Sequence, residues 1–378
     1  MKDQSKIVRD KIEGETGSIV FPIYQSSAFQ LPKGEKFRYS RENNPSVEAL
    51  CQKINELEGS ETGNCFSSGM GAVTTTLLSL LSPGKTILVQ RDIFARSYKF
   101  ITQFLAAWGV NVLIADPGTE NILKYSDRKV DLIFVESITN PTLRVTDIEA
   151  IRSSYPAEKT VIVTDATFAT PVLQKPLSLG SDIVVHSLSK FMSGHNDTIG
   201  GYAGGRKDLM ASIDQNRRTL GPSMDPNTAF LINRGMKTLF VRMKQSGETA
   251  FSIAESLQKI DGVKTVNYPF LKNHPDYAIS RKLLKEKPSV VSFELDTSRI
   301  DIQKFMASLA NIMPANTLGG LNTTITHPST MSHRTISEEE RIKAGISPGL
   351  MRLSVGLESE EDIMDDLEDS ISANIHLC

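Results

Sequence analysis

A single lysine, Lys190, follows an apolar run and a hydroxyl-rich turn in the segment DIVVHSLSKFMSGHNDTIGG, residues 182–201. The apolar run has the composition of a buried β-strand, and Ser187 and Ser189 offer hydroxyls able to hold an anion beside the lysine. A lysine that loses its proton in such a place can form a Schiff base and then shuttle protons. A surface lysine after an edge strand is the alternative, so the chemistry depends on what the rest of the chain places beside Lys190.

A carboxylate, Asp165, follows another apolar run, VIVT, and is expected at the end of a second buried strand. A buried carboxylate needs a cationic partner or several hydrogen-bond donors. A protonated pyridine nitrogen would be such a partner, and the pair would keep that ring an electron sink. A helix N-cap or a structural ion pair is the alternative for this aspartate.

Small residues open a predicted helix that runs to about Leu81; they are Ser67, Ser68, Gly69 and Gly71. Free backbone N–H groups and the positive end of the helix dipole meet there, which favours an anion such as phosphate. A simple helix cap is the alternative. No GxGxxG fingerprint is present, so a dinucleotide site and a nicotinamide dehydrogenase are not favoured.

Short, β-branched and continuously apolar segments predict the strands that position these residues. They are residues 86–90, 110–115, 131–137, 160–166 and 182–187. Such strands are typical of a parallel sheet covered on both faces, and the intervening segments are long enough for crossover helices. Polar residues at the strand ends, including Glu136 and Asn140, should therefore meet at the edge of the sheet where open α/β folds bind ligands.

Three regions are expected along the chain. Residues 1–45 lack helical or strand periodicity over 14–46 but contain aromatic residues, which predicts an arm on a neighbouring subunit, with packing on its own chain as the alternative. Residues 46–230 are predicted to form the α/β domain that carries the site. Helical spacing after about residue 225 and strand candidates at 289–295 and 351–357 predict a smaller C-terminal α+β domain with a linking helix over 231–378.

Composition narrows the possible partners. The 378-residue chain has a formal net charge of −2, which predicts no nucleic-acid surface. No apolar run reaches the roughly 18 residues of a membrane helix, and the charged N-terminal sequence predicts a cytoplasmic location. Three widely spaced cysteines and six histidines without an HExxH pair predict neither a disulfide framework nor a metal site.

The order and spacing of many short segments resemble the pyridoxal-phosphate enzymes of cysteine and methionine metabolism, such as cystathionine γ-synthase, cystathionine γ-lyase and methionine γ-lyase. The segments are PIYQSSAF, YSR, SSGMGA, ESITNPTLRV, TDATFATP, HSLSKFMSGHNDTIGG, SFEL, TLGG, HPSTMSH and RLSVGLE. The resemblance implies the fold type I (aspartate-aminotransferase-like) architecture, pyridoxal 5'-phosphate bound in the 46–230 domain, and amino-acid substrates. It also implies a homotetramer of two tight dimers with the active site at the dimer interface.

The resemblance also implies roles for individual residues. Lys190 resembles the Schiff-base lysine, and Asp165 resembles the partner of the pyridine nitrogen. Arg352 resembles the clamp of the substrate α-carboxylate, a task that suits a forked guanidinium. The other implied contacts are Gly69 and Met70 as backbone donors to the phosphate, Ser187 and Ser189 as hydroxyl donors, Tyr39 and Arg41 as phosphate ligands from the partner subunit, Asn140 near the ring oxygen and substrate carboxylate, and Thr317 beside the lysine.

Departures from the family pattern bear on the reaction. Phe94 stands where the family usually has a tyrosine stacked on the cofactor, so stacking is kept but no hydroxyl is offered to the γ-leaving group. Arg96, two positions on, could hold a second anionic group of the substrate, such as a succinyl carboxylate or a phosphate, or could form an ion pair. Asn322 replaces a glutamate frequently seen after TLGG.

These features predict γ-replacement on an O-activated homoserine, with cysteine as the thiol and cystathionine as the product. The alternative is γ-elimination from cystathionine or methionine, which releases an oxoacid and ammonia. A protein that binds the cofactor without turnover is a remote alternative, to which the loss of the tyrosine gives some weight.

Overall fold

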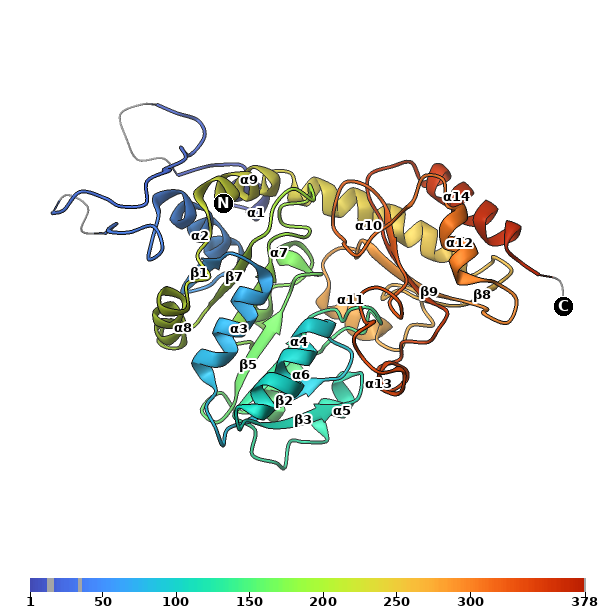
Figure 1. Cartoon of the computed structure of the whole chain (residues 1–378), viewed down its shortest axis with the longest axis horizontal. Helices are drawn as coiled ribbons and strands as arrows, with labels where there is room; N and C mark the ends of the chain where they lie inside the picture. Colours follow the sequence, from blue (N-terminus) through green and yellow to red (C-terminus); the bar gives the residue numbers. More distant parts are fainter. Residues whose placement is uncertain (12–16, 33–35, 377–378) are drawn as a thin grey trace.

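The computed structural model describes residues 1–11, 17–32 and 36–376, and its described part contains two β-sheets joined by a long helix (Figure 1). The larger sheet has the strand order β1-β7-β6-β5-β4-β2-β3, and the smaller has the order β10-β11-β12-β9-β8. This is the α/β architecture predicted from the sequence. The boundaries at residues 45 and 230 stay predictions.

The larger sheet is mostly parallel. Its strands are β1 (Thr62–Phe66), β2 (Thr86–Gln90), β3 (Asn111–Ala115), β4 (Leu132–Glu136), β5 (Val161–Asp165), β6 (Ile183–Ser187) and β7 (Gly201–Gly205). Strands β2 to β6 pair in parallel, whereas β7 runs antiparallel to both β6 and β1. The five strands expected in this sheet are all present, and β1 and β7 are additions.

Helices cover both faces of the larger sheet. The helices of this part of the chain are α1 (Asp3–Ile7), α2 (Pro45–Glu58), α3 (Gly69–Leu80), α4 (Ala95–Lys99), the π-helix η1 (Phe100–Leu105), α5 (Thr119–Leu123), α6 (Ile148–Ser154), α7 (Thr170–Leu173), the 3-10 helix η2 (Pro176–Leu179), α8 (Lys207–Leu220) and α9 (Pro226–Met236); α1 and α9 pack on α2. Alternate residues of each strand point to opposite faces, so Ile87 and Val89 pack in the core beneath α3 and α8, while Leu88 packs beneath α5 and α6. The sheet is thus buried on both sides, as its apolar strands predicted.

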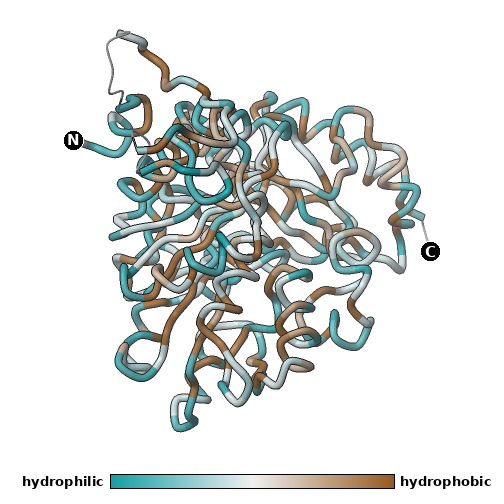
Figure 2. Tube along the Cα trace, turned by 60° about the vertical axis from the view of Figure 1, so that its left-hand side comes forward, coloured by the Kyte–Doolittle hydropathy of each residue, from teal (hydrophilic) through white to brown (hydrophobic). Residues whose placement is uncertain are grey.

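The smaller sheet is covered by the linking helix α10 (Leu239–Leu257) and by helices near the C-terminus (Figure 1). Its strands are β8 (Val263–Asn267), β9 (Val290–Leu295), β10 (Met313–Pro314), β11 (Thr324–Thr326) and β12 (Leu350–Ser354). The other helices of this region are α11 (Tyr277–Leu283), α12 (Ile302–Ser308), α13 (Glu338–Lys343) and α14 (Glu360–Ala373). Figure 2 shows hydrophobic stretches within both parts of the molecule and hydrophilic turns at its edges.

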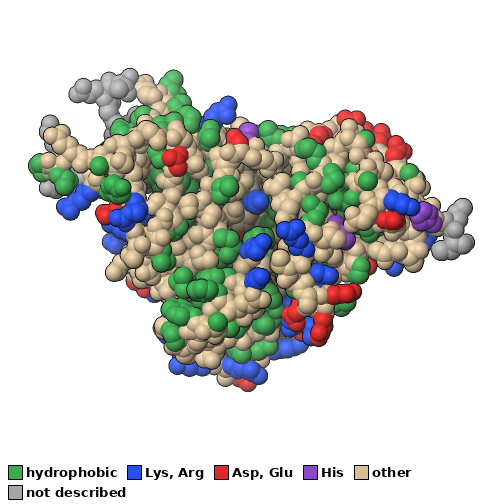
Figure 3. Space-filling view, viewed as in Figure 1, with side chains coloured by type: hydrophobic (Ala, Val, Ile, Leu, Met, Phe, Trp, Pro, Cys, Tyr) green, Lys and Arg blue, Asp and Glu red, His purple; other side chains and the backbone are tan. Residues whose placement is uncertain are grey.

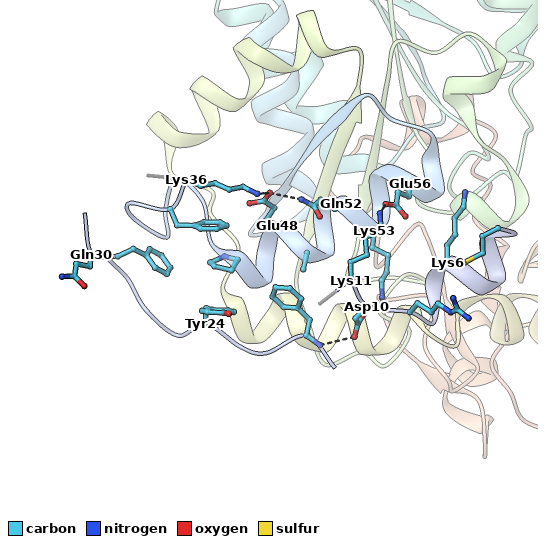
Figure 4. Close-up of a pocket in the computed structure, with 17 residues that line it drawn as sticks. Lys6, Asp10, Lys11, Tyr24, Gln30, Lys36, Glu48, Gln52, Lys53 and Glu56 are labelled. Carbon is cyan, nitrogen blue, oxygen red and sulfur yellow. Dashed lines mark hydrogen bonds and ion pairs between the residues drawn. The ribbon is translucent and has the colours of Figure 1, made fainter. Parts of the chain in front are cut away.

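Of the predicted arm, residues 1–45, the structure describes residues 1–11, which include α1, and residues 17–32 and 36–45. Between residues 17 and 44, the described residues contain no helix or extended strand, only a bridge between Ala28 and Tyr39. The arm, α1 and α2 enclose a cavity of about 860 Å³, at whose rim Lys36 and Glu48 form an ion pair (Figure 4). This cavity contains none of the residues implied in chemistry, so it bears on the arm and not on the reaction. Residues 12–16 and 33–35 of the predicted arm lie outside the described residues.

Candidate active site

Lys190 lies in a tight turn that begins directly after β6, and it is partly buried. Its Nζ donates a hydrogen bond to Thr317 Oγ1 at 3.4 Å, across the boundary between the two sheets. Burial lowers the pKa of Lys190 below its ordinary value, and the charge of Arg352 lowers this pKa further. Both effects favour the neutral amine that a Schiff-base lysine requires.

Asp165 ends β5 and is partly buried. Its Oδ1 accepts hydrogen bonds from the backbone N–H of Thr167 at 2.9 Å and from Thr167 Oγ1 at 2.6 Å. Burial raises the pKa of Asp165, while the bonds from Thr167 and the charge of His186 act in the opposite direction. No ion pair to Asp165 occurs within residues 1–11, 17–32 and 36–376, so the carboxylate fits a cation supplied by a ligand, such as a protonated ring nitrogen.

Thr167 joins this carboxylate to the lysine turn, a role that the sequence analysis did not assign. Its hydroxyl donates to Asp165 and accepts from the backbone N–H of Ser187 at 2.8 Å. The spacing gives a usable signal, because an aspartate commonly accepts from the N–H two residues on. One threonine therefore joins the predicted partner of the ring nitrogen to the backbone of Ser187.

The predicted phosphate seat is built where α3 meets this turn. Ser68 caps α3 by accepting from the backbone N–H of Gly71 at 3.0 Å. A Cβ atom on Gly69 would lie 2.7 Å from Ser187 Cβ, so only glycine lets the helix start approach the turn this closely. Ser189 Oγ accepts from Gly200 N at 3.0 Å, and Met70 follows Gly69 in the first turn of α3. Gly69 and Ser187 are thus in direct contact at the start of α3, and the binding of a phosphate by Gly69, Met70, Ser187 and Ser189 stays a prediction.

Arg352 lies on β12 and is buried, with no carboxylate paired to it in the described part of the chain. Its Nη1 donates to Asn140 Oδ1 at 2.8 Å, and its Nη2 donates to Thr317 O at 2.9 Å and to Thr326 Oγ1 at 2.8 Å. Its Nε has no hydrogen-bond partner. Burial lowers the pKa of Arg352 to about 10, so the guanidinium is charged at neutral pH and suits a carboxylate ligand.

Glu136 links Asn140 to Phe94; the sequence analysis expected it at this edge of the sheet but gave it no task of its own. The carboxylate is buried; its Oε1 accepts from Phe94 N at 2.8 Å and its Oε2 from Asn140 N at 2.9 Å. Burial raises the pKa of Glu136 well above its ordinary value, and the neighbouring charge of Asp165 adds to this effect. Its place at the end of β4 was visible in the sequence, but both of its partners come from folded loops.

Phe94 and Arg96 flank this side of the site. Phe94 precedes the first residue of α4 and is partly buried, and Arg96 is exposed in the first turn. In the part of the chain that the structure describes, no carboxylate pairs with Arg96. The alternative that Arg96 forms an ion pair is therefore not seen within this chain, and its charge is available to a ligand.

Three other residues lie apart from this group. Tyr39 and Arg41 are exposed on the arm, where Arg41 donates to the carbonyl of Arg218 and lies 5.7 Å from the Tyr39 ring. Their predicted contact with a partner's cofactor stays a prediction. Asn322 is exposed in the loop before β11.

The site lies between the two sheets. Figure 3 shows Lys and Arg side chains gathered around a hollow near the middle of the face that it draws. The larger sheet supplies Lys190, Asp165 and Asn140, and the smaller supplies Arg352 and Thr317. Among the described residues, no group of three or more His, Cys, Asp or Glu side chains is placed to hold a metal ion, and no helix is long and apolar enough to cross a membrane. A strand-end lysine, an aspartate free for a ring nitrogen and a helix N-terminus for phosphate define a pyridoxal-phosphate enzyme of fold type I.

Comparison with known proteins gives the family. The model of the family described as Cys/Met metabolism PLP-dependent enzyme matches residues 4–372, and the chain belongs to this family. The chain is 37% identical over 371 residues to the chloroplastic cystathionine gamma-synthase 1 of Arabidopsis thaliana, covering 95% of this chain and 66% of the relative. It is 36% identical over 366 residues to a cystathionine beta-lyase of Bacillus subtilis, covering 96% and 93%.

A solved structure of cystathionine gamma-lyase from Lactobacillus plantarum, complexed with L-serine, matches with a TM-score of 0.94 and 33% identity over 99% of each chain. The protein is thus a pyridoxal-phosphate-dependent enzyme of cysteine and methionine metabolism, as its motifs indicated. These three relatives carry the names of three different reactions, so the comparisons give the family and not the reaction.

Proposed function

We propose that the enzyme catalyses γ-replacement on an O-activated homoserine with cysteine, giving cystathionine. The observation that carries this proposal is the pair Phe94 and Arg96. Phe94 offers no hydroxyl for protonating a poor leaving group such as a thiol, whereas an ester or phosphate leaves as a stable anion. Arg96 is exposed and has no carboxylate partner among the described residues, which suits a substrate with a second negative charge.

The residues of the site have distinct tasks in this proposal. Bound pyridoxal phosphate supplies an electron sink for the negative charge that develops when the substrate loses a proton. Arg352 holds the substrate carboxylate, with Asn140 fixing the guanidinium. Lys190, freed by the substrate amine, takes the proton from the α-carbon, and its lowered pKa keeps it ready to do so. Once it has given up that proton, the Lys190 amine takes a second proton from the β-carbon, and the γ-substituent departs with its bonding electrons as an anion.

Thr317 serves the lysine in this proposal. Its hydroxyl accepts from Lys190 Nζ, and its carbonyl accepts from Arg352 Nη2 at 2.9 Å. One residue of the loop between β10 and β11 therefore contacts both the proposed base and the proposed carboxylate clamp. This arrangement supports a base held at a fixed distance from the α-carbon of the bound substrate.

The second candidate is γ-elimination from cystathionine or methionine, favoured by the likeness to the cystathionine gamma-lyase structure. It uses the same Lys190, Asp165 and Arg352, and it differs in releasing an oxoacid and ammonia instead of capturing a thiol. The homotetramer, the contribution of Tyr39 and Arg41 to a partner's site and the cytoplasmic location stay predictions.

Steady-state assays with O-succinyl-, O-acetyl- and O-phosphohomoserine, each with cysteine, test the proposal. We expect cystathionine formation, with the charged succinyl or phosphate esters preferred over the neutral acetyl ester. Replacement of Arg96 by glutamine should reduce this preference by about 10-fold, the effect of one charge-assisted hydrogen bond of about 1.5 kcal/mol, and should leave the acetyl ester unaffected. Oxoacid release from cystathionine that is faster than any thiol capture would establish the lyase instead.

A further inference from the structure

A buried arginine, Arg242, holds the turn that presents Lys190. It lies in the first turn of α10, the helix that links the two sheets (Figure 1). Its Nη1 donates to the carbonyl of Phe191 at 2.7 Å, and its Nη2 donates to the carbonyl of Met192 at 3.4 Å. The guanidinium therefore binds the backbone of the two residues that directly follow the lysine.

The other contacts of Arg242 are also with neutral groups. Its Nη2 donates to the carbonyl of Gly235 at 3.0 Å, and its Nε donates to Thr238 Oγ1 at 3.0 Å. Within the described chain, no carboxylate forms an ion pair with it, and burial lowers its pKa to about 10. A buried cation without an anionic partner is costly, so its place in the fold calls for a reason beyond charge neutralisation.

The turn is shaped around this guanidinium. Gly194 has a positive φ of 75°, and its N–H donates to the carbonyl of Lys190 at 2.8 Å. A Cβ atom on Gly194 would overlap Nη1 of Arg242, so the guanidinium fills the space that only glycine leaves open. The N–H of Ser193 donates to the carbonyl of Leu188 at 3.0 Å and closes the same turn.

The smaller sheet contacts this turn from another direction. Gly319 also has a φ of 75°, and a Cβ atom there would lie 2.6 Å from the backbone nitrogen of Phe191. The loop that carries Gly319 also carries Thr317, whose hydroxyl accepts from Lys190 Nζ. Arg242 therefore holds the backbone of the two residues after the lysine, and Thr317 contacts the lysine amine.

From these contacts we propose that Arg242 is a positioning residue for Lys190. The two hydrogen bonds to the carbonyls of Phe191 and Met192 fix the orientation of the Lys190 side chain. Because Arg242 is part of α10, they also fix this orientation relative to the linking helix. The inference rests on the proposed role of Lys190 as Schiff-base lysine and general base. In this proposal Arg242 itself makes no contact with the substrate.

Replacement of Arg242 by lysine tests the inference, because an ammonium keeps the positive charge but cannot donate to both carbonyls in the geometry of a planar guanidinium. A displacement of about 1 Å can cost on the order of 100-fold in rate, so we expect kcat to fall between about 10- and 100-fold. KM should change by less than about threefold, since Arg242 binds no substrate. If this variant does not fold, Thr238→Val, which removes only the acceptor of Nε, should lower kcat in the same direction by a smaller factor.

Arg152 provides a matched control. Like Arg242, it donates to three backbone carbonyls, those of Gly180, Tyr155 and Thr160. Unlike Arg242, it also pairs with a carboxylate, Asp182, and it lies at the opposite ends of the strands. Arg152→Lys should lower stability to a similar degree and leave kcat within about twofold of the original enzyme. An equal fall in kcat in both variants would attribute the effect to general destabilisation and overturn the inference.

Hydrogen exchange of the apoprotein gives a readout that does not depend on turnover. In Arg242→Lys the amides of Ser193 and Gly194, which close the turn, should exchange at least about 10-fold faster, while amides of β5 should not change. A loss of kcat with unchanged exchange of these two amides would refute positioning, as would unchanged kcat. A Lys190→Ala enzyme in which borohydride still fixes the cofactor would instead refute the proposed role of Lys190 itself.

Discussion

Replacement of Arg352 by lysine removes the forked guanidinium but keeps a positive charge in the same buried place. In the structure, Nη1 of Arg352 donates to Asn140 and Nη2 donates to Thr317 and Thr326, while Nε has no partner. An ammonium cannot keep these bonds and also hold a carboxylate through two parallel bonds. The loss of one charge-assisted hydrogen bond costs about 1.5 to 3 kcal/mol, so kcat/KM should fall by about 10- to 150-fold.

The assay compares kcat/KM for an amino-acid substrate and for its α-carboxamide analogue in both enzymes. The original enzyme should strongly prefer the carboxylate, and Arg352→Lys should lose most of that preference, because the interaction between the two changes isolates the contact itself. Arg152→Lys, far from the site, should keep the preference. An Arg352→Lys enzyme that distinguishes carboxylate from carboxamide as strongly as the original would refute the assignment of Arg352 as the clamp.

Two further predictions concern the cofactor. Thr167→Val removes a hydroxyl that donates to Asp165 and accepts from the backbone N–H of Ser187. A buried group left without its hydrogen bond costs about 1 to 3 kcal/mol, so the affinity for the cofactor should fall by about 5- to 150-fold. An affinity equal to that of the original enzyme would contradict this role. The capture of pyridoxal phosphate by the apoprotein should quicken as pH rises through the lowered pKa of Lys190, because only the neutral amine attacks. Arg352→Gln removes one cause of that lowering and should move the midpoint of the rate to higher pH; a midpoint that stays or falls would contradict it.

The predictable part of the fold comes from strands with a plain signal. The buried strands β2 to β6 are apolar and β-branched, so hydrophobic pattern alone placed them within a residue or two. Strand β7 was not predicted, because its sequence, GYAGG, is neither strongly apolar nor β-branched. Its glycines are required by close packing, since a Cβ atom on Gly201 would overlap the carbonyl of Ser68 at the start of α3. Such a contact exists only once the helix and the strand have met.

The same distinction applies to the site. Lys190 and Asp165 were predicted because each follows a readable strand, and the motif resemblance extended this to Arg352. Glu136 has its partners, Phe94 and Asn140, on two separate loops, and Arg242 acts on a turn about 50 positions earlier in the sequence. Residues that act by hydrogen bonding to backbone carbonyls or amides leave no periodic pattern in the sequence. Every residue has a backbone carbonyl, so the sequence does not show which one such a side chain will contact.

The relatives show where the choice of reaction must lie. A beta-lyase, a gamma-lyase and a gamma-synthase share this family, and the gamma-lyase structure superimposes with a TM-score of 0.94. The tasks proposed for Lys190, Asp165 and Arg352 are cofactor attachment, electron withdrawal and carboxylate binding, which such reactions have in common. The reactions differ in which bond of the substrate side chain breaks and in whether a thiol is captured, and these changes occur at the β- and γ-carbons, toward the far end of the substrate. Residues that face that end, with Phe94 and Arg96 the first to test, must therefore distinguish replacement from elimination.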